Sequence, residues 1–346
     1  MIRLQDSDDE QALRHAFGQV FTKFQTSAAD HAQAEANRTA LWSQLDEMGV
    51  LAMAAPESLG GGNASLTQLC VLAEEAGANV DSGGLVEHLT ATRFLGADSG
   101  TAYGVVPKAS SATISLRPSR SGRWPAVLTS AGPSLVLGVH GDAVGILRLA
   151  GPPADGHFVG PVRISEVAVD DQSFTPLGPP ARFRMVLDTW RVLTAAYLIG
   201  ICDYLLARTV TYVCDRHQFG KPVGAYQSVA HGLADLPGMI SGARLLTGKA
   251  AWSVDNAVSR PITDLARNEY TDPGVLAAMA LLFAADTANA MADRAVHYHG
   301  AIGAAVETGI HNYYRIVRAL PLLAGPMSIQ RRELADLILE PTWTSR

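Results

Sequence analysis

Apolar residues return every three or four positions along the first hundred residues, in a polar-rich background. That spacing is typical of amphipathic helices. A break follows at Pro56 and the glycines 60–62, and Ser65 is a candidate N-cap for the next helix. Helices are therefore expected over residues 9–25, 30–48, 66–76 and 85–95.

The pattern changes between residues 104 and 180. Short β-rich runs are separated there by Gly, Pro, Ser and Asp, which indicates a small all-β unit, thin for a closed barrel. The expected strands cover residues 112–116, 126–128, 134–139, 144–149 and 162–169.

Long apolar helices are expected from residue 182 onward. Residues 185–214 are apolar nearly all round, which predicts a central helix with neighbours on several sides. A bundle-facing stripe steps by three and four through Tyr226, Val229, Leu233, Leu236, Ile240 and Ala243. Further helices are expected over residues 272–296 and 328–339.

These patterns predict an α+β fold that is mainly α. It has an N-terminal helical domain (1–100), a small, truncated middle β-domain (101–180) and a C-terminal four-helix bundle (181–346). No Gly/Ser-rich or Pro/Gln-rich linker separates the parts, so one integrated unit is expected.

Composition and charge argue against several classes of function. The net charge is -6, with 27 Lys and Arg against 33 Asp and Glu, and this argues against a nucleic-acid surface. No uncharged apolar run approaches the ~18 residues that span a bilayer, and the acidic N-terminus lacks a signal-peptide core. A cytoplasmic protein away from membranes is expected. Cys70, Cys202 and Cys214 lie in apolar segments without a CxxC motif, which predicts buried reduced thiols.

Two short motifs indicate turns or packing more than chemistry. The glycine-rich run at residues 58–65 follows helical sequence, so a turn is favoured over a phosphate loop. His297 and His299 are spaced i, i+2, unlike the i, i+4 pairs of helical zinc sites, and no metal site is predicted with His311. No Gly-x-Ser-x-Gly motif is present, and nothing suggests a Ser/His/Asp triad.

The segment that follows the central helix is different. Arg216 comes where the apolar residues end, and Phe219, Gly220, Lys221 and Pro222 predict a tight turn. The residues alone support two interpretations equally. In one, this is a helix–turn–helix connection with an exposed arginine. In the other, Arg216 binds a diphosphate and Phe219, of an apolar type that is usually buried, contacts an aromatic ring.

The same segment, RHQFGKPVGAYQSVAHGLAD, resembles the Arg-x-x-Phe-Gly signature of the acyl-CoA dehydrogenase family, with its following aromatic-Gln and Ala-Asp positions. Residues 41–77 are similar to the family's N-terminal helical pattern, and residues 295–326 to its Gln-x-x-Gly-Gly-x-Gly stretch. The resemblance covers the chain except the β segment. It implies the same order of parts: helices, a β-domain and a four-helix bundle.

Members of this family oxidise acyl-CoA thioesters to trans-2-enoyl-CoA, with FAD taking the β-hydride and a glutamate removing the α-proton. The resemblance implies that Arg216 contacts the pyrophosphate, and Phe219 the adenine half, of an FAD held mainly by a neighbouring subunit. Gln227 is a further candidate contact. The glycine-rich stretch corresponds to Gly300 and Gly303, with His297 at the position of its usual glutamine and Ala301 at that of its second glycine.

The family's catalytic glutamate has no counterpart, so no catalytic residue is assigned. Ala324 stands at its usual position, and Trp190 stands at the alternative position before an arginine. Neither side chain accepts a proton. The family's Thr-Glu-Pro and Gly-Ser-Asp motifs, which line the flavin and substrate, are also absent, and residues 114–122 are a candidate replacement.

This asymmetry resembles heterotetrameric α2β2 acyl-CoA dehydrogenases of steroid-degrading actinobacteria, in which a shortened subunit without the base pairs with a full-length one. The leading hypothesis is that this chain is such a subunit, that FAD lies at the interface, and that the partner binds the acyl-CoA. A steroid side chain is one candidate substrate. Two alternatives remain: a self-sufficient dehydrogenase whose base is Asp188, Asp203 or Glu307, and a flavin-free scaffold of the same fold.

Overall fold

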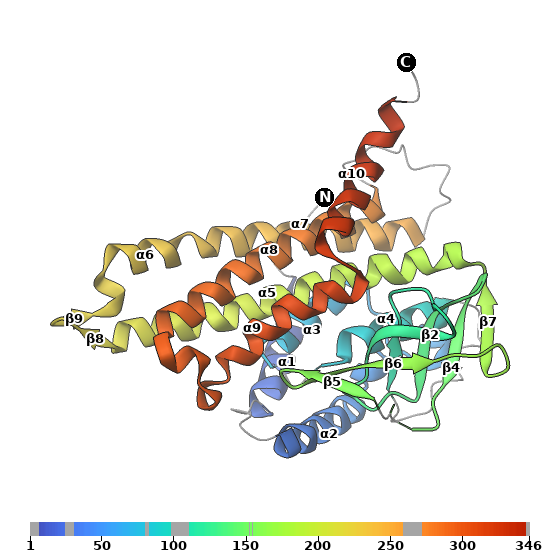
Figure 1. Cartoon of the computed structure of the whole chain (residues 1–346), viewed down its shortest axis with the longest axis horizontal. Helices are drawn as coiled ribbons and strands as arrows, with labels where there is room; N and C mark the ends of the chain where they lie inside the picture. The colour runs from blue at the N-terminus through green and yellow to red at the C-terminus, as the bar shows by residue number, and fades with distance from the viewer. Residues whose placement is uncertain are drawn as a thin grey trace.

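The computed structural model describes residues 7–24, 31–79, 83–97, 111–151, 153, 155–258 and 272–343 (Figure 1). Its N-terminal part is helical, as expected. The longer helices are α1 (Asp8–Lys23), α2 (His31–Glu47), α3 (Leu66–Gly77) and α4 (Leu85–Ala97). Ser65 is the N-cap of α3, as predicted, and forms a capping box with Gln68.

The middle part contains two small sheets, which confirms the expected β unit. One sheet has the order β1-β3-β4-β7 and the other β2-β6-β5. The strands are β1 (Ala112–Ile114), β2 (Arg123–Leu128), β3 (Leu135–His140), β4 (Ala143–Arg148), β5 (Gly156–Val159), β6 (Val162–Ala168) and β7 (Phe174–Gly178). β5 and β7 were not predicted, because they are largely exposed and lack an alternating apolar pattern.

Trp124 is the centre of the small core that the two sheets share. Its indole is fully buried and donates a 2.7 Å hydrogen bond to Val139 O. Gly138 allows this packing, because a Cβ there would lie 2.8 Å from the Trp124 ring. The rest of this core cluster comes from both sheets and their edges: Val127, Val136, Leu147, Val167 and Val169.

The C-terminal part is a helical bundle built around α5 (Phe183–Asp215). α5 packs against α3, α4, α7 (Leu236–Val258) and α8 (Pro273–His299), which explains why it is apolar nearly all round. The predicted stripe from Tyr226 to Ala243 is divided at Asp235 between α6 (Gln227–Ala234) and α7.

Two helices complete the bundle. α9 (Ile310–Ala319) was missed in the sequence, because it is short and follows a glycine-rich turn. α10 (Met327–Trp343) projects beyond the body of the molecule (Figure 1). Single-turn 3₁₀ helices connect many of the elements: η1 (Val50–Ala52), η2 (Glu57–Leu59), η5 (Pro180–Arg182), η6 (Val223–Ala225), η8 (Gly300–Ala304), η9 (Val306–Thr308) and η10 (Leu320–Ala324).

α3 and α5 approach each other closely through glycine. A Cβ on Gly200 would lie 1.8 Å from Glu74 O, and one on Gly77 would lie 2.2 Å from Tyr197 O. Neither position has room for a side chain, so the N-terminal helices and the bundle share one tightly packed seam.

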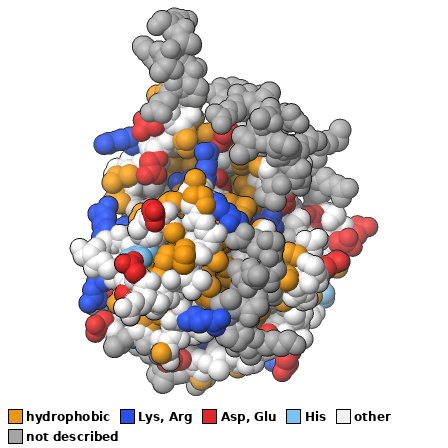
Figure 2. Space-filling model, turned by 90° about the vertical axis from the view of Figure 1, so that its right-hand side faces the viewer, with side chains coloured by type: hydrophobic (Ala, Val, Ile, Leu, Met, Phe, Trp, Pro, Cys, Tyr) orange, Lys and Arg blue, Asp and Glu red, His pale blue; other side chains and the backbone are white. Residues whose placement is uncertain are grey.

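Two helical segments, Pro180–Asp215 and Pro273–Ala304, are long and apolar enough to span a membrane by length and composition. Their apolar windows are 89% and 72% buried inside the fold, which is the environment of core helices. Figure 2 shows one face of the molecule, on which acidic and basic side chains are interspersed with hydrophobic ones. Cys70 and Cys202 are buried as predicted, but the prediction was wrong for Cys214, which is exposed because it lies on the outer face of the last turn of α5.

Candidate functional site

The central helix ends where the sequence predicts it to end. Arg216 follows the last helical residue, Asp215, in an extended conformation (φ −78°, ψ 120°). Its N–H donates to Tyr212 O at 2.9 Å, and its carbonyl accepts from Val223 N at 2.7 Å. Both backbone bonds hold Arg216 at the junction between the helix and the following turn.

The predicted turn is a two-residue β-hairpin. β8 (His217–Gln218) and β9 (Lys221–Pro222) pair antiparallel on either side of Phe219 and Gly220. These two residues have φ values of 51° and 81°, as a type I′ turn requires. The Tyr226 hydroxyl donates to Gln218 O at 3.0 Å and ties the hairpin to the start of α6.

Phe219 is 95% exposed at the tip of this hairpin, so the expectation that an apolar residue here is buried was wrong. The reason is its left-handed backbone, which places the ring on the outside of the turn. That conformation costs a residue with a Cβ about 1 kcal/mol. A large apolar side chain that is both strained and exposed indicates a surface that contacts something else.

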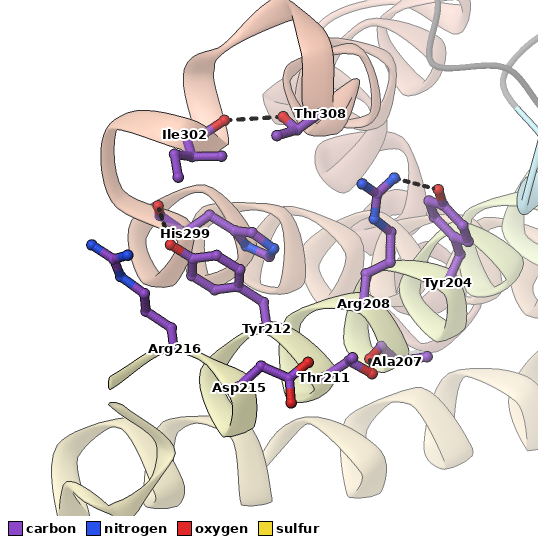
Figure 3. A pocket seen from close by; sticks show the side chains of 10 residues that line it. All are labelled: Tyr204, Ala207, Arg208, Thr211, Tyr212, Asp215, Arg216, His299, Ile302 and Thr308. Atoms are coloured by element: carbon purple, nitrogen blue, oxygen red, sulfur yellow. Dashed lines mark hydrogen bonds between the residues drawn. The ribbon is translucent and has the colours of Figure 1, made fainter. Parts of the chain in front are cut away.

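Arg216 lines an open pocket of about 640 Å³ between the C-terminal half of α5 and the segment from His299 to Thr308 (Figure 3). The remaining lining residues are Tyr204, Ala207, Arg208, Thr211, Tyr212, Asp215 and Ile302. Within the part of the chain that the structure describes, the Arg216 guanidinium has no ion-pair or hydrogen-bond partner. It is therefore a free cation on the pocket wall.

An aromatic pair forms one side of this pocket. The rings of Tyr212 and His299 stack with centroids 4.3 Å apart and an interplanar angle of 20°. His299 Nδ1 contacts Ala295 O at 2.8 Å, and burial lowers the pKa of the imidazole, so the ring is neutral near pH 7. Nδ1 is then the donor, and Nε2 is left as an acceptor.

The other predicted site residues lie at the same end of the bundle but outside the pocket lining. Gln227 is exposed as the first residue of α6, and His297 is exposed on the last turn of α8. Gly300 ends α8 with φ +62°, and a Cβ on it would meet no atom within 4 Å beyond its chain neighbours. Gly303 is buried, and a Cβ on it would lie 2.6 Å from Val296 O, so this glycine is required for packing.

Sequence reasoning missed most of the pocket wall. Tyr204, Arg208 and Tyr212 lie on α5, twelve, eight and four residues before Arg216, which follows the last residue of that helix. A spacing of four places side chains on one face, so this set could have been found by stepping back from Arg216. His299 could not, because its apposition to Tyr212 depends on how α5 and α8 pack.

Trp190, at one of the two expected base positions, is fully buried and donates a 3.1 Å hydrogen bond from Nε1 to Glu87 Oε1. Burial raises the pKa of the Glu87 carboxyl. The cavity beside this pair holds only about 10 Å³, and its lining includes Glu87, Thr194 and Tyr197. That is room for about one water molecule and not for an acyl chain.

The other base candidates lie apart from one another. Ala324 ends η10 and is half-buried. Asp188 is buried beside Arg191, at 3.5 Å, and burial raises the pKa of its carboxyl to about 6. Asp203 forms an ion pair with Arg244 on α7, and Glu307 is exposed in η9.

Two family models match the chain. The acyl-CoA dehydrogenase N-terminal domain matches residues 7–101, and the acyl-CoA dehydrogenase C-terminal domain matches residues 181–339. The chain belongs to the acyl-CoA dehydrogenase family. The matched regions leave out the middle β segment, where the sequence resemblance was weak.

Individual relatives agree with this assignment. The chain is 25% identical to benzylmalonyl-CoA dehydrogenase of Aromatoleum aromaticum over 95% of its length and 97% of the relative. It is 26% identical to acyl-CoA dehydrogenase IpdE2 of Mycobacterium tuberculosis, over 94% and 96%. The match to the probable acyl-CoA dehydrogenase YngJ of Bacillus subtilis is 32% identical but spans only 47% of this chain and 41% of that relative.

Solved structures show the same fold over nearly the whole chain. The ChsE4-ChsE5 complex from Mycobacterium tuberculosis superimposes with a TM-score of 0.79 at 19% identity, covering 97% of this chain and 99% of that one. The Tcur3481-Tcur3483 steroid ACAD G363A variant gives 0.75 at 24% identity, covering 96% and 98%.

FAD is the cofactor that membership of this family implies, and the residues present fit its ADP half. Arg216 offers a guanidinium that has no partner among the described residues, as a diphosphate would require, and Phe219 offers an exposed ring. The open space around Gly300 leaves its backbone accessible to a ligand, although Ala301 follows it.

Proposed function

We propose that this chain is a non-catalytic subunit of an FAD-dependent acyl-CoA dehydrogenase complex. It contributes Arg216, Phe219 and the Gly300 region to an FAD shared with a full-length subunit, in a cytoplasmic α2β2 heterotetramer. When bound, FAD supplies the acceptor for the hydride removed in α,β-dehydrogenation of a CoA thioester. The full-length partner binds that thioester and provides the base.

The main support for this proposal is the tip of the β8–β9 hairpin. Phe219 is almost fully exposed in a strained conformation, three residues after an arginine without a protein partner among the described residues. A monomer gains nothing from this arrangement, whereas a ligand that extends from a neighbouring subunit would cover the ring and neutralise the charge.

The interior supports the non-catalytic part of the proposal. Trp190 occupies the space at one expected base position, and the adjacent cavity of about 10 Å³ is too small for a substrate. Ala324 has no proton-accepting group. The only carboxylate within hydrogen-bond reach of Trp190 among the described residues is Glu87, which is sealed from solvent.

The assembly part of the proposal is supported by two structural neighbours. They are described as the ChsE4-ChsE5 complex and as a Tcur3481-Tcur3483 steroid ACAD, and both names denote two different chains. By analogy the substrate is a bulky CoA thioester, with a steroid side chain as one candidate.

A self-sufficient dehydrogenase is the second candidate function. The raised pKa of the Asp188 carboxyl is the observation that favours it. A carboxyl with a pKa of about 6 suits a general base. Against this role, Arg184 and Arg191 both contact Asp188.

The experiment compares the chain alone with the chain co-expressed with a full-length homologue encoded nearby. Bound flavin and dye-linked acyl-CoA oxidation are measured on both samples. We expect a colourless, inactive chain alone and a flavin-loaded, active complex. Flavin and activity in the isolated chain would overturn the proposal, and a flavin-free complex would indicate a scaffold.

Arg216→Ala tests the residue assignment in the same complex. It is expected to reduce retained flavin at least about tenfold, the loss of one charge-assisted contact. Arg332→Ala, which removes an exposed arginine on α10, is the matched control and should leave flavin retention unchanged.

A further inference from the structure

The structure brings together three residues of the β-domain that the sequence did not connect. Ser119 Oγ lies 2.7 Å from His140 Nδ1, and His140 Nε2 lies 2.9 Å from Asp171 Oδ1. No pattern in the sequence had suggested a Ser/His/Asp arrangement, and the structure contains these three residues in hydrogen-bond contact. The three residues come from different turns and strands, which is why no sequence motif reveals them.

The proton positions in this chain of hydrogen bonds follow from the donors available. An ionised carboxylate only accepts hydrogen bonds, so His140 Nε2 carries the proton that faces Asp171. Nδ1 is then the acceptor for the Ser119 hydroxyl. This is the protonation state in which a histidine removes a proton from a serine, although the two ring nitrogens are exchanged relative to the usual triad.

The backbone holds all three residues in place. Ser119 N donates to Val139 O at 2.9 Å, which fixes the serine beside the end of β3. The His140 ring packs edge-on against Phe174, with centroids 5.3 Å apart, and is only 14% exposed. Asp170 Oδ1 accepts from Gln172 N and Ser173 N, each at 2.9 Å, and so fixes the turn that carries Asp171.

The loop around Ser119 is rich in hydrogen-bond donors. Ser121 and Gly122 form a type I′ turn, with φ values of 50° and 69°, closed by reciprocal backbone bonds between Arg120 and Arg123. In the part of the chain that the structure describes, the N–H groups of Ser121 and Gly122 donate to no acceptor. They are available for an oxyanion.

Three arginines make the same loop positive. Arg117 and Arg120 flank Ser119 at two positions and one position, and Arg123 lies four residues beyond it. The Arg117 guanidinium donates to Leu322 O, while Arg120 is exposed and Arg123 lies 3.8 Å from the exposed Glu166. A substrate with a negatively charged leaving group suits this surface.

We propose that Ser119, His140 and Asp171 form a second reactive site, which transfers the acyl group of an anionic acyl thioester to water. Ser119 Oγ forms a bond to the carbonyl carbon as its proton passes to His140 Nδ1. The C–S bond then breaks, and the thiolate takes the proton from His140. Water attacks the acyl-serine, again losing a proton to His140, which returns it to Ser119 Oγ as the acyl–oxygen bond breaks. The products are a carboxylic acid and a free thiol.

The inference of a reactive site rests on the geometry of Ser119, His140 and Asp171 and does not depend on the proposed function. The choice of a CoA thioester, whose leaving group carries phosphates, rests on the proposed function. The role of Asp171 is to orient His140, and because its side chain is 97% exposed its contribution is smaller than that of the other two residues.

Covalent labelling of the full chain with a fluorophosphonate, which reacts with activated serines, tests the site. Mass spectrometry is expected to map the label to Ser119. Ser119→Ala should abolish it, and His140→Gln should slow labelling about 100-fold, the effect of losing a general base. Asp171→Asn should slow it less than about tenfold. Ser241→Ala removes an exposed serine on α7, outside the β-domain, and should change nothing.

Labelling of Ser119 no faster than that of Ser241, or equal rates in wild type and His140→Gln, would overturn the site. Thermal melting of each variant shows whether a loss of labelling comes from unfolding. Ser119 is partly exposed, so Ser119→Cys, which retains a nucleophile, offers a second variant if Ser119→Ala fails to fold.

Butyryl-CoA and p-nitrophenyl acetate test the substrate class. Thiol release from butyryl-CoA should depend on Ser119, and added salt should weaken it more than hydrolysis of the neutral ester. Hydrolysis of the neutral ester alone would overturn the thioester assignment. Flavin content is measured on the same complex, so normal flavin without labelling overturns this inference alone. Normal labelling without flavin overturns the proposed function alone.

Discussion

The indole N–H of Trp190 donates to the carboxyl of Glu87, and both side chains are sealed inside the protein. The pair joins α4 to α5, and Trp190 is the residue that we expected, from the sequence resemblance, at the family's alternative base position. A residue that cannot accept a proton thus serves as the hydrogen-bond donor to one that can. The arrangement stabilises the fold and closes the interior.

Trp190→Phe is expected to destabilise the chain by about 2–4 kcal/mol. It leaves the buried Glu87 carboxyl without its indole donor and leaves part of the indole space empty. Denaturant unfolding measures the difference. Trp252→Phe, at a 43% exposed position on α7, is the matched control and should change stability by less than about 0.5 kcal/mol. Equal effects at both positions would contradict this account of the pair.

The Glu87→Gln variant is expected to gain stability relative to the wild-type protein as the pH rises. Burial raises the pKa of Glu87 in the folded state above its ordinary value of 4.5. Below that value both states are protonated and the carboxyl carries no penalty. Above it the unfolded state ionises first, so wild-type stability falls as pH increases toward the folded pKa. The glutamine still accepts from Trp190 and has no charge to bury.

The measurement is the difference in unfolding free energy between wild type and Glu87→Gln at pH 4.5 and pH 8. We expect that difference to change by about 1–3 kcal/mol in favour of the variant. Glu57→Gln, on the exposed η2, should show no such trend. A pH-independent difference would mean that Glu87 titrates alike in both states.

Phe219→Gly separates stability from cofactor binding. Glycine adopts positive φ freely, so the variant hairpin loses strain, and stability should be unchanged or rise by about 1 kcal/mol. Flavin retention by the complex should nevertheless fall, because the exposed ring is gone. Gly220→Ala acts in the opposite sense, adding about 1 kcal/mol of strain while retaining the ring. Flavin retention that is unaffected by Phe219→Gly would exclude a role for the ring.

Gly300 and Gly303 are expected to respond differently to alanine. Gly303→Ala places a methyl group 2.6 Å from Val296 O and should cost about 1–3 kcal/mol in the isolated chain. Gly300→Ala meets no neighbouring atom, but φ +62° with ψ −142° is a conformation that few residues other than glycine adopt, so the variant should cost about 1–3 kcal/mol of backbone strain. If FAD approaches the Gly300 backbone, this variant should lose flavin out of proportion to its stability. Thermal unfolding and flavin content of the complex measure the two effects.

Much of the fold could be predicted from the sequence. The helical periods and the Ser65 cap indicated the N-terminal helices, and the all-round apolar pattern identified α5 as the central helix. Exposed elements were missed: β5 and β7 carry little apolar pattern, and α9 is short. Local patterns report burial, so elements at the surface leave a weaker signal.

The residues of the candidate site also fall into two groups: those that the sequence indicated and those that it did not. Arg216 and Phe219 could be singled out as candidates because the turn between two helices has a local sequence signature that resembles the family's. The apposition of Tyr212 and His299, and that of Ser119, His140 and Asp171, depends on how distant segments pack. The exposure of Phe219 was wrongly anticipated because residue type alone does not reveal a left-handed backbone.

The glycine contact between α3 and α5 bears on how the protein can be divided. Gly77 and Gly200 bring the backbones of the two helices together, where a side chain on either would collide with main-chain atoms. Each of the two parts therefore has the shape that the other requires for close packing. A fragment that begins after the β-domain would present a flat apolar flank of α5 to water and aggregate. The N-terminal and C-terminal regions are therefore matched separately in sequence, yet each supplies a packing surface that the other requires.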